Sequence, residues 1–461
     1  MECFTVFADE IEGRIDPFYY RPEFKKLRDS LSNLKHKPLG EVIEFSGETW
    51  NQKDFFDNEF PYIEISEIDT TTGEIRNITY YEKDKAPSRA KMIVREDDII
   101  VSTTRPHRGA IALIDKTKEG YIASTGFAIL RKLKIELNKR FLLFILRTQL
   151  SLKQMLQRSS GGNYPAITSE ELKNVIIPLP PLSIQEKIIR LMEIAYSKNQ
   201  LKESEAQQLL DSINSYVLDE LGIKLPELKE HLTYLVFSDE TKSDRLDPRY
   251  YKPHFKEFEI ELNKIKDIKN IGEISEYIGS GATPKAGGDA YTSDKDGIPF
   301  IRIVNLKSNT VVLDDVLYIK EEIYEGMLKR TQLKPNDVLL SMAGTIGLSV
   351  VVPENLGKAN INQAIARIVV KNNVNPFYLS ALLNSKVGKI QTDRLSRPAV
   401  QANINLEEIR ALKIPLPPLP IQNKIAEEVK SRMQKAEQLQ KEAKEELEKA
   451  KQEVEKIILG E

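Results

Sequence analysis

Several loops of this 461-residue chain combine arginine, lysine, asparagine, glutamine or histidine with glycine. Such side chains bind flat polar groups and phosphates through paired hydrogen bonds, and a neighbouring glycine allows the close backbone approach that these bonds need. Six candidates for such contacts lie in the first half, in TTRPHRG and QRSSGGNYP: Arg105, His107, Arg108, Arg158, Asn163 and Tyr164. Six more lie in the second half, in TPKAGG, IRIVN and DRLSRPAVQAN: Lys285, Arg302, Asn305, Arg394, Arg397 and Gln401.

Taken singly, each of these residues is as well explained as a solvated surface side chain or a member of a salt bridge. Their placement favours a shared role, because QRSSGGNYPAI and RLSRPAVQANI stand at equivalent places in the two halves, directly before a short capped helix. Two tyrosine pairs, Tyr19 with Tyr20 and Tyr250 with Tyr251, could stack on unpaired bases. Their position among Phe and Leu favours packing within the globular part instead.

Motifs for catalysis are missing from the sequence. Methyl transfer to DNA would require a glycine-rich cofactor loop after a strand and an Asp/Asn-Pro-Pro-aromatic segment, whereas the paired prolines of PLPPL follow leucine. Four histidines and one cysteine give no zinc-site spacing, and no GxxxxGK[ST] loop is present for a nucleotide. With 69 acidic and 67 basic residues, short matches to a nuclease carboxylate cluster arise by chance. The sequence predicts no catalytic, cofactor-binding or metal-binding residues in this chain.

Composition indicates an ordinary globular protein. Hydrophobic residues make up 41% of the chain, the formal net charge is −2, and no apolar run approaches the roughly eighteen residues of a membrane span. The acidic opening MECFTVFADEIEG does not resemble a secretory signal, and a single cysteine, Cys3, cannot form an internal disulfide. We therefore expect a cytoplasmic protein without a membrane contact. Any binding of nucleic acid must come from local basic patches and not from bulk charge.

The chain contains an internal duplication. IPLPPLSIQEKI at 177–188 and IPLPPLPIQNKI at 414–425 share ten of twelve residues. RIDPFYYRPEFKKL at 14–27 likewise resembles RLDPRYYKPHFKEF at 245–258, and YIEISEI at 62–68 matches the alternating pattern of FIRIVNL at 300–306. Asn138 and Asn375 each precede an apolar segment and are predicted to begin helices of about fifteen residues. A period near 237 residues indicates that a whole domain was duplicated.

Each proline-rich copy is followed by a long amphipathic pattern. Apolar residues recur at spacings of three and four from Ile184 to Leu221 and from Ile421 to Ile457, among Glu, Lys and Gln, which predicts coiled-coil-like helices. The prolines end the last strand and stiffen the link into each helix. The sequence thus predicts a mixed α/β (α+β) fold with two globular domains, 1–180 and 245–417. Two helical regions, 181–244 and 418–461, complete it.

This order of parts resembles the specificity subunit of type I restriction-modification enzymes. The resemblance rests on the DPxYY opening, the α/β domain, the PLPPL-x-x-Q boundary and the long helix, each present twice. In the second half GATP at 281–284, GIPFIRIVNL at 297–306 and VLLSMAGTIG at 338–347 resemble target recognition domains of that family. The first half lacks GATP and has STTRPHRGAI in place of SMAGTIGL, which implies two domains of different specificity.

The resemblance implies that each domain reads one half of a split, asymmetric target in double-stranded DNA. It also implies that the two helices pair antiparallel, relate the halves by a pseudo-twofold axis and set the spacing between half-sites. The chain would catalyse nothing itself. It would recruit two methyltransferase subunits and, for cleavage, two restriction (translocase) subunits, and S-adenosylmethionine, ATP and Mg would be bound by those partners. The twelve loop residues are then candidates for contact with DNA.

Two other classes of function agree with parts of the sequence. A coiled-coil scaffold that tethers proteins without DNA specificity agrees with the near-neutral charge and predicts weak DNA binding that is insensitive to salt. A recognition subunit with several phosphate contacts loses affinity steeply as salt rises. A self-contained enzyme would need motifs that the sequence lacks. The repeat and the missing catalytic motifs together favour the recognition subunit.

Overall fold

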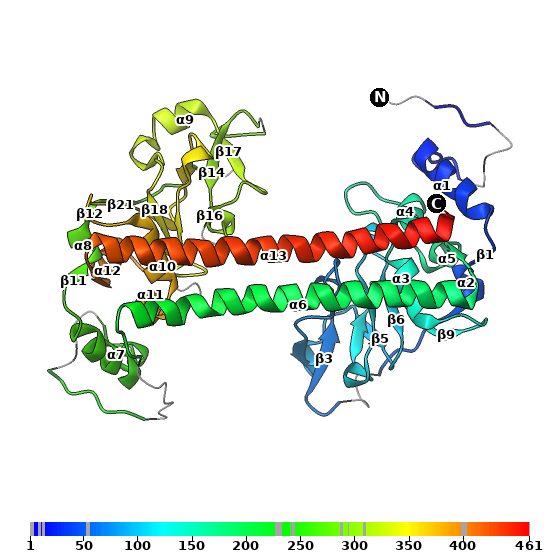
Figure 1. The fold of residues 1–461 in the computed structure, drawn as a ribbon, viewed down its shortest axis with the longest axis horizontal. Helices are drawn as coiled ribbons and strands as arrows, with labels where there is room; N and C mark the ends of the chain where they lie inside the picture. The colour runs from blue at the N-terminus through cyan, green and yellow to red at the C-terminus, as the bar shows by residue number, and fades with distance from the viewer. Residues whose placement is uncertain are drawn as a thin grey trace. The chain divides into compact units, whose positions relative to one another are not determined.

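The computed structural model describes residues 4–460 except 8–10, 12–13, 52–55, 226–232, 240, 242–244, 286–288, 294, 308–309 and 398–402. The chain divides into two compact units (Figure 1). Unit 1 consists of Met1–Ser204 together with Leu439–Glu461, and unit 2 of Glu205–Gln438. Both boundaries fall inside long helices, so each unit contains parts of both helices. Unit 1 is therefore completed by the last residues of the chain.

Unit 1 contains two four-stranded sheets and a two-stranded ribbon. The first sheet has the order β2 (Ile43–Ser46), β9 (Phe127–Leu133), β6 (Ile99–Ser102) and β7 (Ile111–Leu113). The second has the order β4 (Thr79–Glu82), β3 (Glu59–Ile63), β8 (Ile122–Ser124) and β5 (Ala90–Ile93). The ribbon pairs β1 (His36–Pro38) with β10 (Ile176–Pro178). All neighbours are antiparallel except β3 and β8, which are parallel.

Unit 2 repeats the first sheet of unit 1 and three of the four strands of the second, in which the fourth strand lies at the opposite edge. Its first sheet has the order β12 (Ser275–Ser280), β21 (Ile365–Val370), β18 (Val338–Ser341) and β19 (Ser349–Val351). Its second has the order β13 (Tyr291–Thr292), β17 (Leu317–Ile319), β14 (Ile298–Ile301) and β20 (Asn360–Ile361), with β14 and β20 parallel. Ribbons join β11 (Ile268–Asn270) to β22 (Lys413–Pro415) and β15 (Leu306–Lys307) to β16 (Thr310–Val311). The predicted duplication and mixed fold class are confirmed.

Short helices surround the sheets of each unit. Unit 1 has α1 (Pro22–Ser32), α2 (Leu39–Val42), α3 (Lys139–Leu146), α4 (Gln149–Gln157) and α5 (Ser169–Lys173), with 3-10 turns η2 (Ile65–Glu67), η3 (Lys83–Lys85), η4 (Pro106–Arg108) and η5 (Lys116–Lys118). Unit 2 has α7 (Pro253–Asn263), α8 (Ile271–Ile274), α9 (Glu321–Glu325), α10 (Pro376–Asn384), α11 (Lys386–Leu395) and α12 (Leu406–Arg410), with η6 (Pro248–Tyr251), η7 (Ile303–Asn305), η8 (Lys329–Thr331) and η9 (Glu354–Leu356).

The asparagines predicted to begin helices do so, but the helices are shorter than expected. Asn138 accepts a hydrogen bond from the backbone N–H of Arg140, and Asn375 accepts bonds from those of Phe377 and Tyr378. In place of one helix of about fifteen residues, each unit has two. The break falls between α3 and α4 and between α10 and α11, where a side chain from a long helix satisfies the new N-terminus. Glu455 accepts from Gln149 N at 2.6 Å, and Asn214 accepts from Lys386 N at 2.7 Å.

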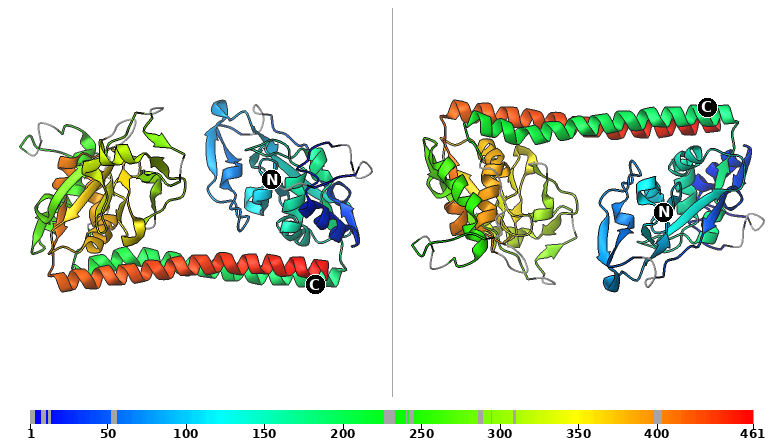
Figure 2. Two further views of the ribbon diagram at one scale, coloured as in Figure 1. Left: turned by 90° about the horizontal axis from the view of Figure 1, so that it is seen from above. Right: turned by 90° about the horizontal axis from the view of Figure 1, so that it is seen from below.

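The two long helices are α6 (Leu182–Glu220) and α13 (Leu419–Leu459). Within unit 1 they run antiparallel, because Lys198 lies 3.9 Å from Glu446 while Lys202 lies 2.8 Å from Glu442. The C-terminal end of α13 lies beside the start of α6 (Figure 2), and Leu447 and Val454 are buried in the core of unit 1. Unit 1 thus has a core built from both ends of the chain.

Within unit 2 the same two helices also run antiparallel. Lys424 pairs with Glu220 at 2.8 Å, and Arg432 donates to the Ser212 carbonyl oxygen at 3.1 Å. Val429 is buried in the unit 2 core. Within the part of the chain that the structure describes, no helix combines the length and apolarity needed to cross a bilayer.

A buried glutamine explains the repeated PLPPL-x-x-Q segment. Gln185 is 3% exposed, accepts a hydrogen bond from Asn138 N at 3.0 Å and donates to the Pro180 carbonyl oxygen at 2.9 Å. In unit 2, Gln422 makes the matching bonds to Asn375 N at 2.9 Å and to the Pro417 carbonyl oxygen at 2.8 Å. Each glutamine therefore ties the start of a long helix to the proline segment and to a helix of its globular domain.

We predict that Gln185→Ala destabilises unit 1. The substitution removes a buried amide and its two hydrogen bonds, to Asn138 N and to the Pro180 carbonyl oxygen, at a cost of about 1 to 3 kcal/mol in the free energy of unfolding. Urea unfolding followed by circular dichroism measures the change. Gln200→Ala, an exposed position on the same helix, is the matched control and should change stability by less than about 0.5 kcal/mol. Equal stability of the two variants would contradict the role assigned to Gln185.

A second prediction concerns the core of unit 1. Leu447 is fully buried, so Leu447→Ala should cost about 2 to 5 kcal/mol through the cavity it leaves. Hydrogen–deuterium exchange should then quicken in β6 and β9, which share its core. Val429→Ala on the same helix is the comparison and should quicken exchange in β18 and β21. Unchanged exchange in β6 and β9 after Leu447→Ala would show that α13 does not complete unit 1.

Candidate nucleic-acid interface

Two loops of unit 1 lie side by side, and we call them the first loop pair. One is residues 103–109, which connect β6 to β7 and include the turn η4, and the other is residues 159–166, which connect α4 to α5. Backbone hydrogen bonds join them, from Arg105 N to the Pro165 carbonyl oxygen at 2.7 Å and from Ile167 N to the Thr103 carbonyl oxygen at 2.9 Å. Ser160 and Ala166 exchange two bonds of 2.8 Å. Four backbone hydrogen bonds thus hold the two loops in shape and together.

The first loop pair borders a cleft of about 650 Å³. The guanidinium of Arg105 lies 4.0 Å from the centre of the Tyr164 ring, and its Nη2 donates to the Asn163 carbonyl oxygen at 3.2 Å. Tyr164 is 70% exposed, so arginine and ring form an accessible stacked platform. His107 and Arg108 also line the cleft. Five of the six first-half candidates therefore meet at one place.

The arginines of this cleft keep their charge unneutralised. Neither Arg105 nor Arg108 forms an ion pair with a carboxylate in the ranges that the structure describes. Arg158, the sixth candidate, differs because it pairs with Glu171 at 3.1 Å and its guanidinium lies 5.9 Å from the Tyr19 ring centre. Unpaired guanidinium groups beside a cleft attract anions such as phosphate and supply donors to base edges.

His107 sits between these charges. Burial of the ring lowers its pKa below the usual 6.5, and the neighbouring Arg108 and Arg105 lower it further. The buried Nδ1 atom has no hydrogen-bond partner among the described residues. The imidazole is therefore neutral at neutral pH, with one nitrogen that can still accept or donate a hydrogen bond depending on its tautomer.

Unit 2 has an equivalent arrangement, which we call the second loop pair: residues 342–348 and 396–403, of which 398–402 are not described. Ile404 N donates to the Met342 carbonyl oxygen at 2.9 Å, as Ile167 does to Thr103 in unit 1. The backbone of Arg397 forms an antiparallel β-bridge with that of Asn403, and its guanidinium donates to the Glu408 carboxylate at 3.2 Å. Gln401 lies outside the described residues. The two loop pairs share a backbone arrangement but differ in side chains.

Arg394 has strong internal partners. It lies 2.7 Å from Glu259 and its guanidinium lies 4.5 Å from the Tyr250 ring centre. Burial by itself would raise the pKa of Glu259, but hydrogen bonds from Lys413 and Arg394 lower it to about 2. Arg394 is therefore engaged in the same way as Arg158 in unit 1, against the first tyrosine of the opening motif.

The remaining second-half candidates lie in other segments of unit 2. Lys285 is exposed after β12 and forms no ion pair with a described residue. Arg302 donates through Nη2 to the Asp315 carbonyl oxygen at 2.8 Å. Asn305 is fully buried; it accepts from Arg302 N at 3.0 Å and donates to the Asp314 carbonyl oxygen at 3.0 Å. Asn305 thus closes a turn, and Arg302 and Lys285 remain nearer the surface.

The paired tyrosines pack inside the globular part, as the sequence indicated. Tyr19 is 2% exposed and Tyr250 is 5% exposed. The hydroxyl group of Tyr20 donates to the Arg14 carbonyl oxygen at 2.7 Å, and that of Tyr251 to the Arg245 carbonyl oxygen at 2.5 Å. The DPxYY motif therefore folds back on itself and holds the segment that precedes each first helix.

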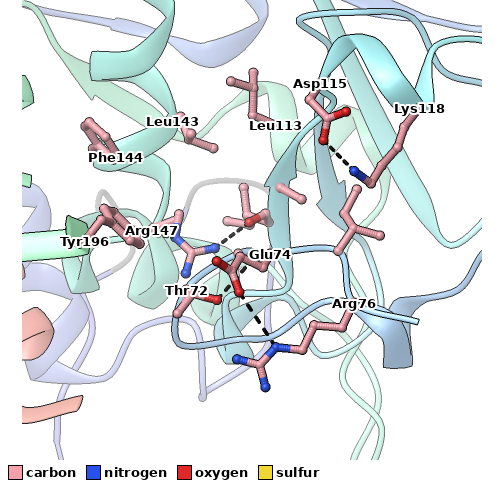
Figure 3. Close-up of a pocket in the computed structure, with 14 residues that line it drawn as sticks. Thr72, Glu74, Arg76, Leu113, Asp115, Lys118, Leu143, Phe144, Arg147 and Tyr196 are labelled. Atoms are coloured by element: carbon pink, nitrogen blue, oxygen red, sulfur yellow. Dashed lines mark hydrogen bonds and ion pairs between the residues drawn. The ribbon is translucent and has the colours of Figure 1, made fainter. Parts of the chain in front are cut away.

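A second cavity of unit 1, about 390 Å³, lies away from the loop pairs around Arg147 (Figure 3). The buried guanidinium donates to the carbonyl oxygens of Ile111 and Thr71 and, at 3.1 Å, to the Tyr196 hydroxyl. It thereby links α3, β7, the loop after η2 and α6. At the equivalent position of unit 2, Asn384 exchanges two bonds with the backbone of Ser349. Nε, Nη1 and Nη2 of Arg147 all donate to groups of the protein itself, so we interpret this cavity as structural.

Sequence reasoning missed the three cleft-lining residues that lie outside the two predicted loop segments, namely Asp16, Phe18 and Leu156. Asp16 and Phe18 precede the loop pair by almost ninety positions, and their one signal is membership of the repeated DPxYY motif. No group of three or more His, Cys, Asp or Glu side chains able to hold a metal occurs among the residues described. The arrangement can bind a polyanion with polar edges.

Comparisons with known proteins point the same way. Residues 32–211 and 263–449 match the family model described as type I restriction modification DNA specificity domain. The chain is 24% identical over 455 residues to a putative type I restriction enzyme MjaX specificity subunit of Methanocaldococcus jannaschii, covering 96% of this chain and 97% of that one. It is 27% identical to the type I restriction enzyme EcoBI specificity subunit of Escherichia coli, covering 66% and 60%.

A solved structure of similar fold comes from a study of complex assembly and conformational transition of the type I R-M system. It aligns with a TM-score of 0.51 and 22% identity, over 92% of this chain and 97% of the other.

The electrostatics of the cleft yield a prediction for His107. Its pKa in the folded chain lies below the unfolded value of about 6.5, so the unfolded state binds the proton first and stability falls as pH drops below 6.5. Arg108→Ala removes one repelling charge and should raise the pKa of His107, as measured by NMR titration of the imidazole Cε1–H. Arg190→Ala, an exposed arginine of α6, is the control and should leave it unchanged. A pKa unmoved by Arg108→Ala would contradict the charge coupling.

Proposed function

We infer the function of this chain from one premise: it belongs to the family of type I restriction modification DNA specificity domains. It is the sequence-specific DNA-recognition subunit of a type I restriction-modification system. We propose that each of its two units reads one half of a bipartite, asymmetric target in double-stranded DNA.

One observation carries the proposal of two different half-sites. Both units place a loop pair on the same backbone scaffold, directly before the short helices α5 and α12. The side chains differ, because Arg105, His107 and Arg108 stand where the second pair has Gly344, Thr345 and Ile346. Hydrogen-bonding side chains read base edges in the grooves, so two sets of side chains on one scaffold suit two half-sequences.

We assign the twelve candidates two kinds of work. Side chains with donors or acceptors not used up inside the protein would contact DNA: Arg105, His107, Arg108, Asn163, Tyr164, Lys285, Arg302 and Arg397. Gln401, which lies outside the described residues, is assigned to this group from its place in the sequence alone. Arg158, Arg394 and Asn305 have strong internal partners and would hold the loops in place. This division predicts that substitutions in the first group change the DNA sequence preference, whereas substitutions in the second group lower the stability of the fold.

The two long helices would set the spacing between the half-sites and carry the partner subunits. We propose a complex with two methyltransferase subunits and, for cleavage, restriction (translocase) subunits. S-adenosylmethionine, ATP and Mg would be bound on those partners, and the chain itself would be non-catalytic and cytoplasmic. Support comes from the antiparallel helix contacts found within each unit and from the missing catalytic motifs.

The test is methylome sequencing of DNA from cells that express this chain with the methyltransferase of its system, compared with cells that express the methyltransferase alone. A bipartite, asymmetric methylated motif that requires this chain is the expected result. Binding of the purified complex to DNA carrying that motif should weaken steeply between 50 and 200 mM salt, by roughly 10³-fold or more if six phosphates are contacted. Salt-insensitive, sequence-independent binding would favour a scaffold.

The spacing role predicts the effect of a matched insertion. Seven residues added after Ser204 in α6 and seven added after Gln438 in α13 keep the apolar seam and lengthen both helices by about 10 Å. The spacer of the methylated motif should then grow by about three base pairs at 3.4 Å each, while both half-sequences stay the same. In the comparison variant, three residues are inserted instead of seven at the same point of each helix. This insertion breaks the apolar seam between the helices and should abolish methylation. An unchanged spacer after the seven-residue insertion would show that the helices do not set it.

A further inference from the structure

One residue of the first loop pair has a backbone conformation that its type rarely adopts. Five non-glycine residues with positive φ occur in the described ranges, and four of them are Asp97, Asp267, Asp315 and Asn336. Aspartate and asparagine tolerate this left-handed region because their short side chains bond locally, whereas long side chains are strained there. The fifth residue is Arg105, with φ 48° and ψ 51°.

Unit 2 shows what the fold itself requires at this point. Ser102 and Ser341 end equivalent strands, and the bridges from Thr104 to Ala166 and from Ala343 to Asn403 align the following residues. Arg105 therefore corresponds to Gly344, which is also left-handed, with φ 65°. A side chain at Gly344 would meet no atom within 4 Å, so glycine serves there for backbone conformation alone. The backbone conformation at this position favours glycine, yet unit 1 has arginine there.

The strained arginine is also held in place. Its guanidinium lies over the Tyr164 ring at 4.0 Å, and Nη2 is fixed by the Asn163 carbonyl oxygen. Stacking on an aromatic face leaves the N–H edge of a guanidinium open for hydrogen bonds. Nε and Nη1 have no hydrogen-bond partner among the residues described, and no described carboxylate pairs with this arginine. Strained residues persist where the side chain has a function that outweighs the cost of its conformation.

A planar donor fork at a DNA surface matches one base better than any other. Guanine presents two acceptors, O6 and N7, side by side in the major groove, and a guanidinium can donate to both. A phosphate would need only the charge, which Arg108 on the following 3-10 turn already supplies without strain or stacking.

We propose, on the basis of the proposed function, that Arg105 reads a guanine at one defined position in the half-site bound by unit 1. The stacked Tyr164 orients it, and the half-site bound by unit 2 has no corresponding arginine contact.

The experiment compares methylomes for the wild-type chain, Arg105→Gly and Arg105→Lys, each co-expressed with the methyltransferase of its system. Arg105→Gly should relax one G·C position of one half-site to all four bases, with methylation of mismatched sites rising at least tenfold over wild type, while the other half-site and the spacer stay the same. Arg105→Lys should relax the same position, because lysine keeps the charge but lacks the fork.

Stability is measured in parallel on the purified chains. Because glycine fits the left-handed turn and removes the strain, Arg105→Gly should leave the Tm unchanged or raise it by about 2 °C. Asn336→Gly is the matched control: it makes the same backbone change at an exposed left-handed residue outside both loop pairs, at the other end of β18 from residues 342–348, and should alter no base of the motif.

The outcomes separate the possibilities. A single relaxed G·C position with an unreduced Tm supports base reading by Arg105. Equal loss of methylation at all sites with the motif unchanged would assign Arg105 to a phosphate, and an unaltered motif at full activity would leave it no role; either overturns the proposal. A Tm lowered by more than about 4 °C would make Arg105 structural and overturn it as well. If the wild-type chain itself directs no bipartite motif, it is the proposed function that fails.

Discussion

The buried glutamine at the end of each proline segment is the contact on which the rest of the architecture depends. Gln185 and Gln422 each use both ends of one amide, accepting from the first N–H before a domain helix and donating to a proline-segment carbonyl. An amide placed in this way fixes three backbone segments at once, and a buried amide without these partners would be costly. The prolines stiffen the segment that leads into each long helix, and the glutamine fixes the direction in which the helix starts. Both features recur because both domains need a long helix that starts in a defined direction.

The helices are shared between the units, and this sharing supports the loop pairs. Side chains of α13 enter the core of unit 1, and those of α6 enter the core of unit 2. Glu455 and Asn214 then satisfy the N-termini of α4 and α11, the helices that lead directly into residues 159–166 and 396–403. The loops proposed to read DNA are thus anchored at one end by a helix that the opposite half of the chain completes. Precise recognition needs such support, because side chains on an unsupported loop lose their geometry.

Charge is organised locally in a chain whose net charge is only −2. Most arginines near the loop pairs are neutralised, as Arg158 is by Glu171, Arg394 by Glu259 and Arg245 by Glu408. These pairs fix the frame. Arg105 and Arg108 project from that frame with no such partner in the described residues, so a small region carries uncompensated positive charge. Such an arrangement suits a subunit whose specificity comes from a few side chains and whose affinity is shared with other subunits of a complex.

The sequence by itself determined the duplication, the order of globular domains and long helices, and the capping asparagines, because each of these depends on periodicity or on contacts between residues a few positions apart. It also identified, as candidate binding segments, loops that belong to the two loop pairs. Only the tertiary structure decided which basic side chains bind partners within the protein. Their partners Glu171, Glu259 and Asp315 are brought to them by folding, and no local sequence pattern indicates these contacts. The same holds for the break after Arg147, which depends on Glu455 more than 300 residues away. The left-handed conformation of Arg105 belongs to this second group, because its backbone is held by Pro165 across the loop pair.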